Sequence, residues 1–171
     1  MKWPILLLAL LAPALANDRV TFAGDAYSLA FPQGWTKTKA PSADAEFARE
    51  SPDKAVIISV NCDAVPEGAS ADLDATGKAS AKSYAAAIQF KGEARLSDGA
   101  LDGCDAKFLT LAPQNAEEGS IAMFAVFVDT KEHLVRIVST MNPQLADETR
   151  EACLAIVKSF RREEAESKDN G

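Results

Sequence analysis

Apolar residues at every second position predict a series of β-strands along this chain. Each segment is bounded by residues that favour turns. The predicted strands are residues 20–22, 27–31, 45–49, 55–62, 93–97, 104–112, 120–129 and 134–141. Most of them are joined by short turns, so we expect one mainly antiparallel sheet. In residues 121–128 both faces are apolar, which predicts a central strand covered on both sides.

Two other segments have the 3.6-residue period of amphipathic helices. The first has Ser70 as its expected N-cap and ends near residues 90–92. Gly77 lies in its inward stripe, where the missing side chain permits a close approach to the sheet. The second has Asn142 as its cap and an apolar stripe that extends to Phe160. Together these elements predict an α+β fold, a three-layer α/β/α sandwich with one helix on each face of the sheet.

The first sixteen residues have the features of a secretion signal. Lys2 carries the positive charge, residues 5–11 form a short apolar run, and small residues precede a cleavage site after Ala16. The run is about a third to a half of the ~20 residues that span a bilayer. A buried helix is the alternative, but it does not account for the small residues. We therefore predict a mature chain that begins at Asn17, is periplasmic or secreted, and has no membrane anchor.

The mature chain is predicted to contain one domain, residues 17–160. Residues 161–171 are charged and lack an apolar period, which predicts a disordered tail. The whole chain has 18 Lys and Arg residues, 25 Asp and Glu residues and a formal net charge of −7. Because it is acidic and has no basic cluster, we expect no nucleic-acid partner.

The sequence contains three cysteines, Cys62, Cys104 and Cys153. In an oxidising compartment an odd number favours one disulfide and one buried thiol, with three free thiols as the alternative. The expected strand directions place Cys62 and Cys104 at the same edge of the sheet, so we predict that pairing and leave Cys153 free in the core. The spacings match no zinc site, and His133 is the single histidine, so no metal site is expected.

One short motif points to a known family. Residues 27–35, Tyr-Ser-Leu-Ala-Phe-Pro-Gln-Gly-Trp, form a strand that ends in Phe-Pro-x-Gly-Trp. This resembles the opening of PsbP-like domains, a superfamily that includes DcrB-like envelope proteins and Mog-type Ran-binding proteins. The order of elements over residues 20–160 is similar too. The resemblance implies the sandwich fold and a non-enzymatic role as an accessory subunit or binding partner. The lipid-attachment Cys of DcrB-type lipoproteins is missing, and no functional residue transfers.

The remaining candidate residues have structural explanations. Trp35 is a candidate contact for a partner, but a large aromatic residue after a strand and a turn is more often buried. Residues 98–105 suggest a calcium loop, yet Ala100 and Leu109 occupy positions that need oxygen ligands. Two Asp-Gly turns explain the same segment.

No catalytic constellation is present in the sequence. There is no Gly-x-Ser-x-Gly motif, and His133 lies at the start of a strand. We expect no catalytic residues, no cofactor and no metal. The leading prediction is a non-enzymatic, exported accessory or protein-binding domain of the bacterial envelope, with another envelope protein as its partner. A periplasmic carrier of a small molecule or lipid is the alternative, and it would need a cavity.

Overall fold

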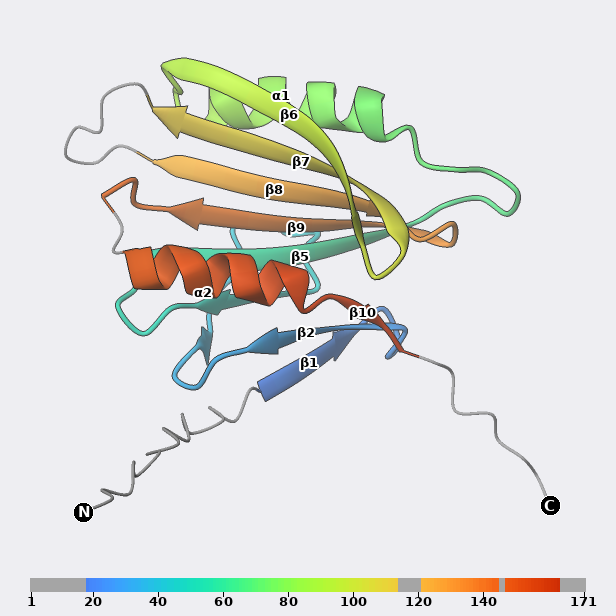
Figure 1. Ribbon diagram of the computed structural model, residues 1–171, viewed down its shortest axis with the longest axis horizontal. Coiled ribbons are helices and arrows are strands. Elements are labelled where there is room, and N and C mark those ends of the chain that lie inside the picture. The colour runs from blue at the N-terminus through green and yellow to red at the C-terminus, as the bar shows by residue number, and fades with distance from the viewer. Residues whose placement is uncertain (1–17, 114–120, 145–146, 164–171) are drawn as a thin grey trace, which may run out of the picture.

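The computed structural model describes residues 18–113, 121–144 and 147–163 and contains two antiparallel sheets (Figure 1). The large sheet has the strand order β3-β4-β5-β9-β8-β7-β6, and the small sheet has the order β1-β2-β10. The strands are β1 (Asp18–Phe22), β2 (Tyr27–Phe31), β3 (Thr36–Lys37), β4 (Phe47–Glu50), β5 (Val56–Ala64), β6 (Gly92–Leu101), β7 (Cys104–Pro113), β8 (Ala122–Asp129), β9 (His133–Met141) and β10 (Arg161–Arg162).

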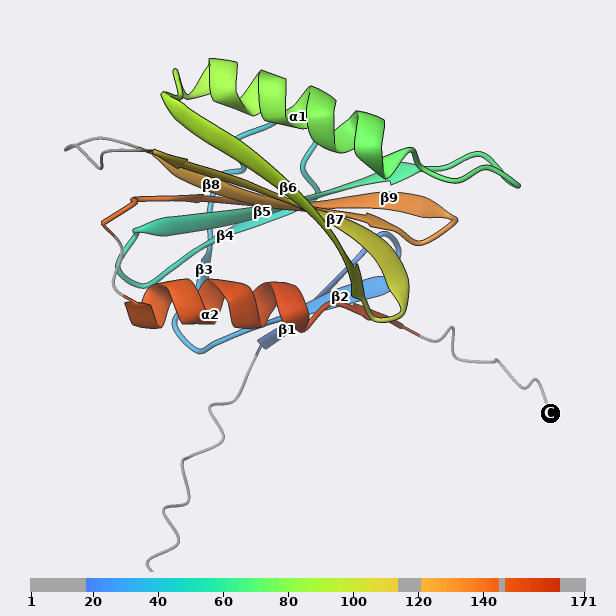
Figure 2. The same cartoon turned by 45° about the horizontal axis from the view of Figure 1, so that its top comes forward.

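Two helices lie on opposite faces of the large sheet, α1 (Leu73–Ala87) on one and α2 (Asp147–Lys158) on the other (Figure 2). The small sheet lies on the same side as α2. This arrangement confirms the predicted α/β/α sandwich. The expectation of one sheet is corrected, because β1 and β2 pair with β10 in the separate small sheet. The cap of α1 differs from the expectation: the carboxylate of Asp72, not Ser70, accepts a hydrogen bond from the N–H of Ala75 at 2.8 Å. Neither helix in the described part of the chain is long and apolar enough to cross a membrane.

The core has two parts, one on each face of the large sheet. Between the large sheet, α2 and the small sheet lie aromatic and branched side chains, including the fully buried Phe31 and Phe160. Beneath α1 lies a smaller group that includes Leu109 and Phe127. Gly77 permits the close approach expected of α1, because a Cβ there would lie 3.0 Å from Cδ2 of Leu96.

The ordered fold continues past residue 160, where the sequence predicted a disordered tail. Arg161 and Arg162 form β10 and pair with Ser28 and Tyr27 of β2. The N–H of Glu163 then donates to the carbonyl of Ala26 at 2.8 Å. The expected tail is therefore corrected for these three residues, because pairing through the backbone needs no apolar side chains. The rest of that segment and the predicted signal, residues 1–16, lie outside the described residues.

The first of the two Asp-Gly pairs is not a turn. Asp98 and Gly99 lie inside β6, which continues to Leu101, so the predicted strand 93–97 is too short. Gly99 is needed there for space, since a Cβ would lie 2.5 Å from Cε2 of Phe108 on the neighbouring strand. The second pair, Asp102 and Gly103, forms the turn as predicted.

Candidate interaction site

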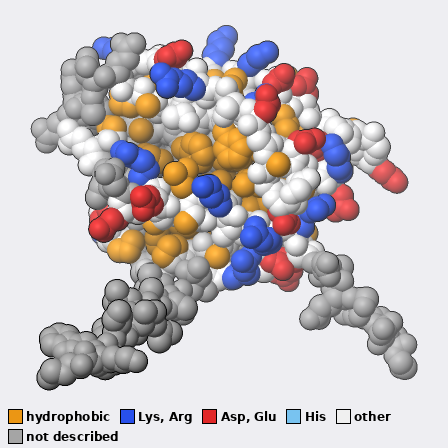
Figure 3. Space-filling model, in the orientation of Figure 1, with side chains coloured by type: hydrophobic (Ala, Val, Ile, Leu, Met, Phe, Trp, Pro, Cys, Tyr) orange, Lys and Arg blue, Asp and Glu red, His pale blue; other side chains and the backbone are white. Residues whose placement is uncertain are grey.

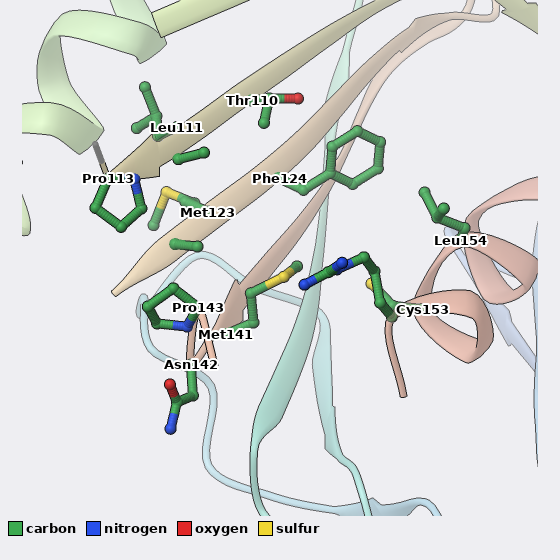
Figure 4. A pocket seen from close by; sticks show the side chains of 13 residues that line it. Thr110, Leu111, Pro113, Met123, Phe124, Met141, Asn142, Pro143, Cys153 and Leu154 are labelled. Carbon is green, nitrogen blue, oxygen red and sulfur yellow. The ribbon is translucent and has the colours of Figure 1, made fainter. Parts of the chain in front are cut away.

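Within the part of the chain that the structure describes, helix α2 leaves part of its face of the sheet uncovered. A groove of about 400 Å³ lies between α2 and the ends of β7, β8 and β9 (Figure 4). It is open to the surface on one side and lined mostly by apolar side chains. Those that project into it or form its walls include Thr110, Pro113, Phe124, Met141, Cys153 and Leu154.

The alternation along β8 explains why the groove is apolar. Phe124, Val126 and Val128 belong to the core on the α2 side of the sheet; Val126 and Val128 are fully buried, whereas Phe124 is only partly buried. The ring of Phe124 stacks on that of Phe108, with 6.2 Å between the centroids. The α2 face of β8 is thus covered at one end and open at the other. The sequence predicted cover along its whole length.

The outer wall of the groove is formed by α2. Leu154 is 39% exposed, although it is a large apolar residue on a helix whose neighbouring residues Cys153 and Ile156 are buried. Figure 3 shows that apolar side chains gather in the middle of this face, with charged side chains of both signs around them. An apolar centre with a charged margin is the usual composition of a surface that binds another molecule.

None of the three thiols is activated as a nucleophile, including that of Cys153 in the wall of the groove. Burial raises the pKa of Cys62 to about 12 and also raises the pKa values of Cys104 and Cys153. Each thiol is therefore protonated near neutral pH, and the thiolate is the reactive form. Cys153, in the wall of the groove, donates from Sγ to Oγ of Ser139 at 3.2 Å.

The expected Cys62–Cys104 disulfide is not formed: all three cysteines are free. Both residues do lie near the same end of the strands in the large sheet, as the strand directions required. However, β9 and β8 separate β5 from β7. Three strand spacings of about 4.8 Å give about 14 Å along the sheet, whereas the Cα atoms of a disulfide lie within about 7 Å. The local pattern predicted strand direction but not the order of the strands.

Peptide mapping without reduction tests this correction. We expect three unlinked cysteines, with Cys153 alkylated only after unfolding because it is buried and hydrogen-bonded. Cys62, which is only partly buried, is expected to react earlier. A linked peptide containing Cys62 and Cys104 would contradict the sheet order described above.

Trp35 lies in the core and not on the surface as a partner contact. It is 6% exposed, and its ring centroid lies 5.8 Å from that of Phe31. Its carbonyl accepts a hydrogen bond from Nη1 of Arg49 at 3.2 Å. This is the buried arrangement that the sequence favoured.

His133 and Asp98 also have structural roles. Nδ1 of His133 lies 2.9 Å from the hydroxyl of Tyr27, which is 2.7 Å from Oγ1 of Thr130, so the β8–β9 turn is tied to the small sheet. Asp98, from the segment considered for calcium, forms an ion pair with Lys107. Among the residues that the structure describes, no three His, Cys, Asp or Glu side chains are placed to hold a metal ion.

Comparison with known proteins identifies the fold but no closer relative. No family model matches the sequence, and no curated protein matches it. Among solved structures, the cyanobacterial PsbP of Synechocystis sp. PCC 6803 superimposes with a TM-score of 0.64 at 14% identity, over 89% of this chain and 95% of that one. The chain has the PsbP-like fold.

Two further structures share this PsbP-like fold. The Ran-binding protein Mog1p of Saccharomyces cerevisiae has a TM-score of 0.55 at 13% identity, over 87% of this chain and 96% of that one. A protein of Bacteroides thetaiotaomicron has a TM-score of 0.59 at 11% identity, over 85% of this chain and 48% of that one. These likenesses confirm the fold that residues 27–35 suggested.

The local sequence pattern does not indicate the groove of this PsbP-like domain. Phe124 was assigned to a covered strand, and Met141 to the end of another. Leu154 offered a signal, because it is a large apolar residue outside the helical stripe that ends at Phe160. An apolar residue that does not face the sheet indicates a second apolar surface on the helix.

Proposed function

We propose that this domain is a non-enzymatic accessory protein that binds an apolar segment of a partner protein in the groove beside α2. The observation that carries the proposal is the open apolar groove, with Phe124 on its floor and Leu154 on its wall. Exposed apolar surface of this kind is unfavourable in water unless another molecule covers it. We further propose that the protein acts in the bacterial envelope, because residues 1–16 have the pattern of a secretion signal.

The composition of the groove suits a flexible recognition of apolar side chains. Met141 lines it from the α2 side of the sheet, and methionine adapts its shape to different partners. Lys and Arg side chains near the groove would contact polar groups next to the bound segment (Figure 3). A protein-binding role is also in keeping with the Ran-binding protein that shares the fold.

A carrier of a small apolar molecule is the second candidate. The same groove supports it, since about 400 Å³ lies within the range of ligand pockets. Gly77 packs closely against Leu96 under α1, which leaves little room for a cavity on that face of the sheet. The groove lies on the opposite face of the sheet, where Gly77 has no influence.

Site-specific photo-cross-linking in the producing cells tests the proposal. A photoreactive amino acid at position 154 is expected to capture a protein reproducibly, and the same group at the exposed Lys82 on α1 serves as the control. The additional change Phe124→Glu should abolish the adduct at position 154 while circular dichroism shows a folded protein. Identical adducts at positions 154 and 82, or none, would contradict protein binding. A small molecule retained in native mass spectrometry and lost in the Phe124→Glu protein would favour the carrier.

A further inference from the structure

Strand β6 forms a long, unpaired edge of the large sheet. It is ten residues long and hydrogen-bonds to β7 alone among the described strands. Figure 1 shows its first half at the outer rim of the sheet. Residues 92–95 are all exposed. A free edge of this length offers a row of backbone donors and acceptors to another strand.

The turn at the end of β6 determines which backbone groups face outward. Asp102 and Gly103 have φ values of 49° and 73°, as in a two-residue type I′ turn. In such a hairpin the flanking pair, Leu101 and Cys104, exchanges both hydrogen bonds. Along β6, residues whose backbone groups bond to β7 then alternate with residues whose backbone groups face the open edge. The residues whose N–H and C=O groups face the open edge are Gly92, Ala94, Leu96, Asp98 and Ala100.

Two opposite charges lie on the exposed face of this edge. Glu93 and Arg95 are two residues apart and therefore share one face, with 3.5 Å between Oε2 and Nη2. Their side chains are 73% and 78% exposed, respectively. Leu96 lies on the other face, against α1 at Gly77. Exposed edges are commonly blunted by charged side chains, a proline or a bulge. β6 has no proline, its register with β7 is unbroken, and its one acid and one base are complementary to those of a second copy.

We propose that β6 pairs antiparallel with β6 of a second copy of this chain, about a two-fold axis at Ala94. In this register Gly92 lies opposite Leu96 of the second copy. The N–H and C=O groups that face the open edge in one copy therefore meet those of the other copy. Glu93 of each copy lies opposite Arg95 of the other in a non-hydrogen-bonded pair, where side chains approach most closely. Four charges then alternate in sign across the interface.

Neighbouring registers lack this match. An axis at Arg95 would place the two Arg95 side chains opposite each other, which is unfavourable. An axis at Leu96 would place Arg95 opposite Ser97 of the second copy and lose both ion pairs. Glu93 and Arg95 lie beside the groove, because they pair with Ala112 and Thr110 of β7. The backbone groups that would join the two copies belong to β6 and line no part of it.

Charge reversal with rescue tests the register. Because an interface of one strand per copy is small, sedimentation should be measured up to about 100 μM protein. We expect a dimer for the full chain. Glu93→Arg or Arg95→Glu alone should raise the dissociation constant on the order of tenfold or more, since each turns two attractive pairs into repulsive ones. The double variant should restore the wild-type value. Failure of the double variant to do so would overturn the register.

A proline substitution tests the backbone pairing without altering charge. Ala94→Pro removes an outward N–H and leaves the bonds between β6 and β7, so it should give a folded monomer. Ala94→Ser, which keeps the donor, should remain dimeric. The groove variant Phe124→Glu should also remain dimeric, which separates this proposal from the proposed function. A wild-type chain that is monomeric at all concentrations would overturn the proposal.

Discussion

Replacing Phe160 with alanine is expected to lower the free energy of unfolding by about 3–5 kcal/mol. The side chain is fully buried where α2 ends and β10 begins. Its ring lies 5.8 Å from that of Tyr27 and 6.5 Å from that of Phe22, both on the small sheet. Truncation leaves a cavity at the point where α2, the small sheet and the large sheet meet, and the surrounding side chains relax into such a cavity only in part.

Urea denaturation of Phe160→Ala measures this loss, with Leu154→Ala as the matched control on the same helix. Leu154 is 39% exposed, so its truncation should cost less than about 1.5 kcal/mol. Similar losses for the two variants would contradict the placement of Phe160 at this junction.

Replacing Asp129 with asparagine is expected to lower the free energy of unfolding at pH 7 by about 1.5–3 kcal/mol. Asp129 is 3% exposed, and its carboxylate accepts hydrogen bonds from the backbone N–H and Nζ of Lys131, both at 2.9 Å. Burial acts to raise the pKa of Asp129, but these bonds and the charge of Lys131 outweigh it and hold the pKa below its ordinary value.

The sign of the pH dependence follows from this lowered pKa. The stabilisation by Asp129 is complete above the pKa of the unfolded chain, about 4, and it is lost as pH falls through the lower pKa of the folded state. Urea denaturation at pH 7 and pH 3 should therefore show a smaller difference between wild type and Asp129→Asn at the lower pH. The exposed neighbour Glu132, changed to Gln, should behave as wild type at both. An equal difference at both pH values would contradict this account.

The local pattern of the sequence predicted the elements of the fold but not their lateral order. Alternation in residues 55–62 and 134–141 identified β5 and β9, and the stripe ending at Phe160 identified α2. The position of Cys104 on β7, separated from β5 by two intervening strands, depends on pairing between distant segments, which no local period encodes. The predicted disulfide was therefore placed at the correct end of the strands, but it joined two strands that are not neighbours.

The candidate site was hidden for a related reason. An apolar face predicts that something covers it, but the pattern around Phe124 does not say how far the covering helix extends. The strand β10 was hidden because Arg161 and Arg162 pair through their backbone, which is the same for every residue type. The motif in residues 27–35 indicated the fold because its turn and its aromatic residues all serve the core.

The small sheet has a consequence for the order in which the protein folds. It joins β1 and β2, at residues 18–31, to β10 at residues 161–162, and the N–H of Glu163 bonds to Ala26. Contacts of such long sequence separation form slowly, because a long loop must close before they stabilise anything. The hairpin of β1 and β2 therefore lacks its third strand until residue 162 has been synthesised. A chain that emerges from the ribosome in order stays incomplete through most of its synthesis, and the last residues of α2 and β10 close the structure.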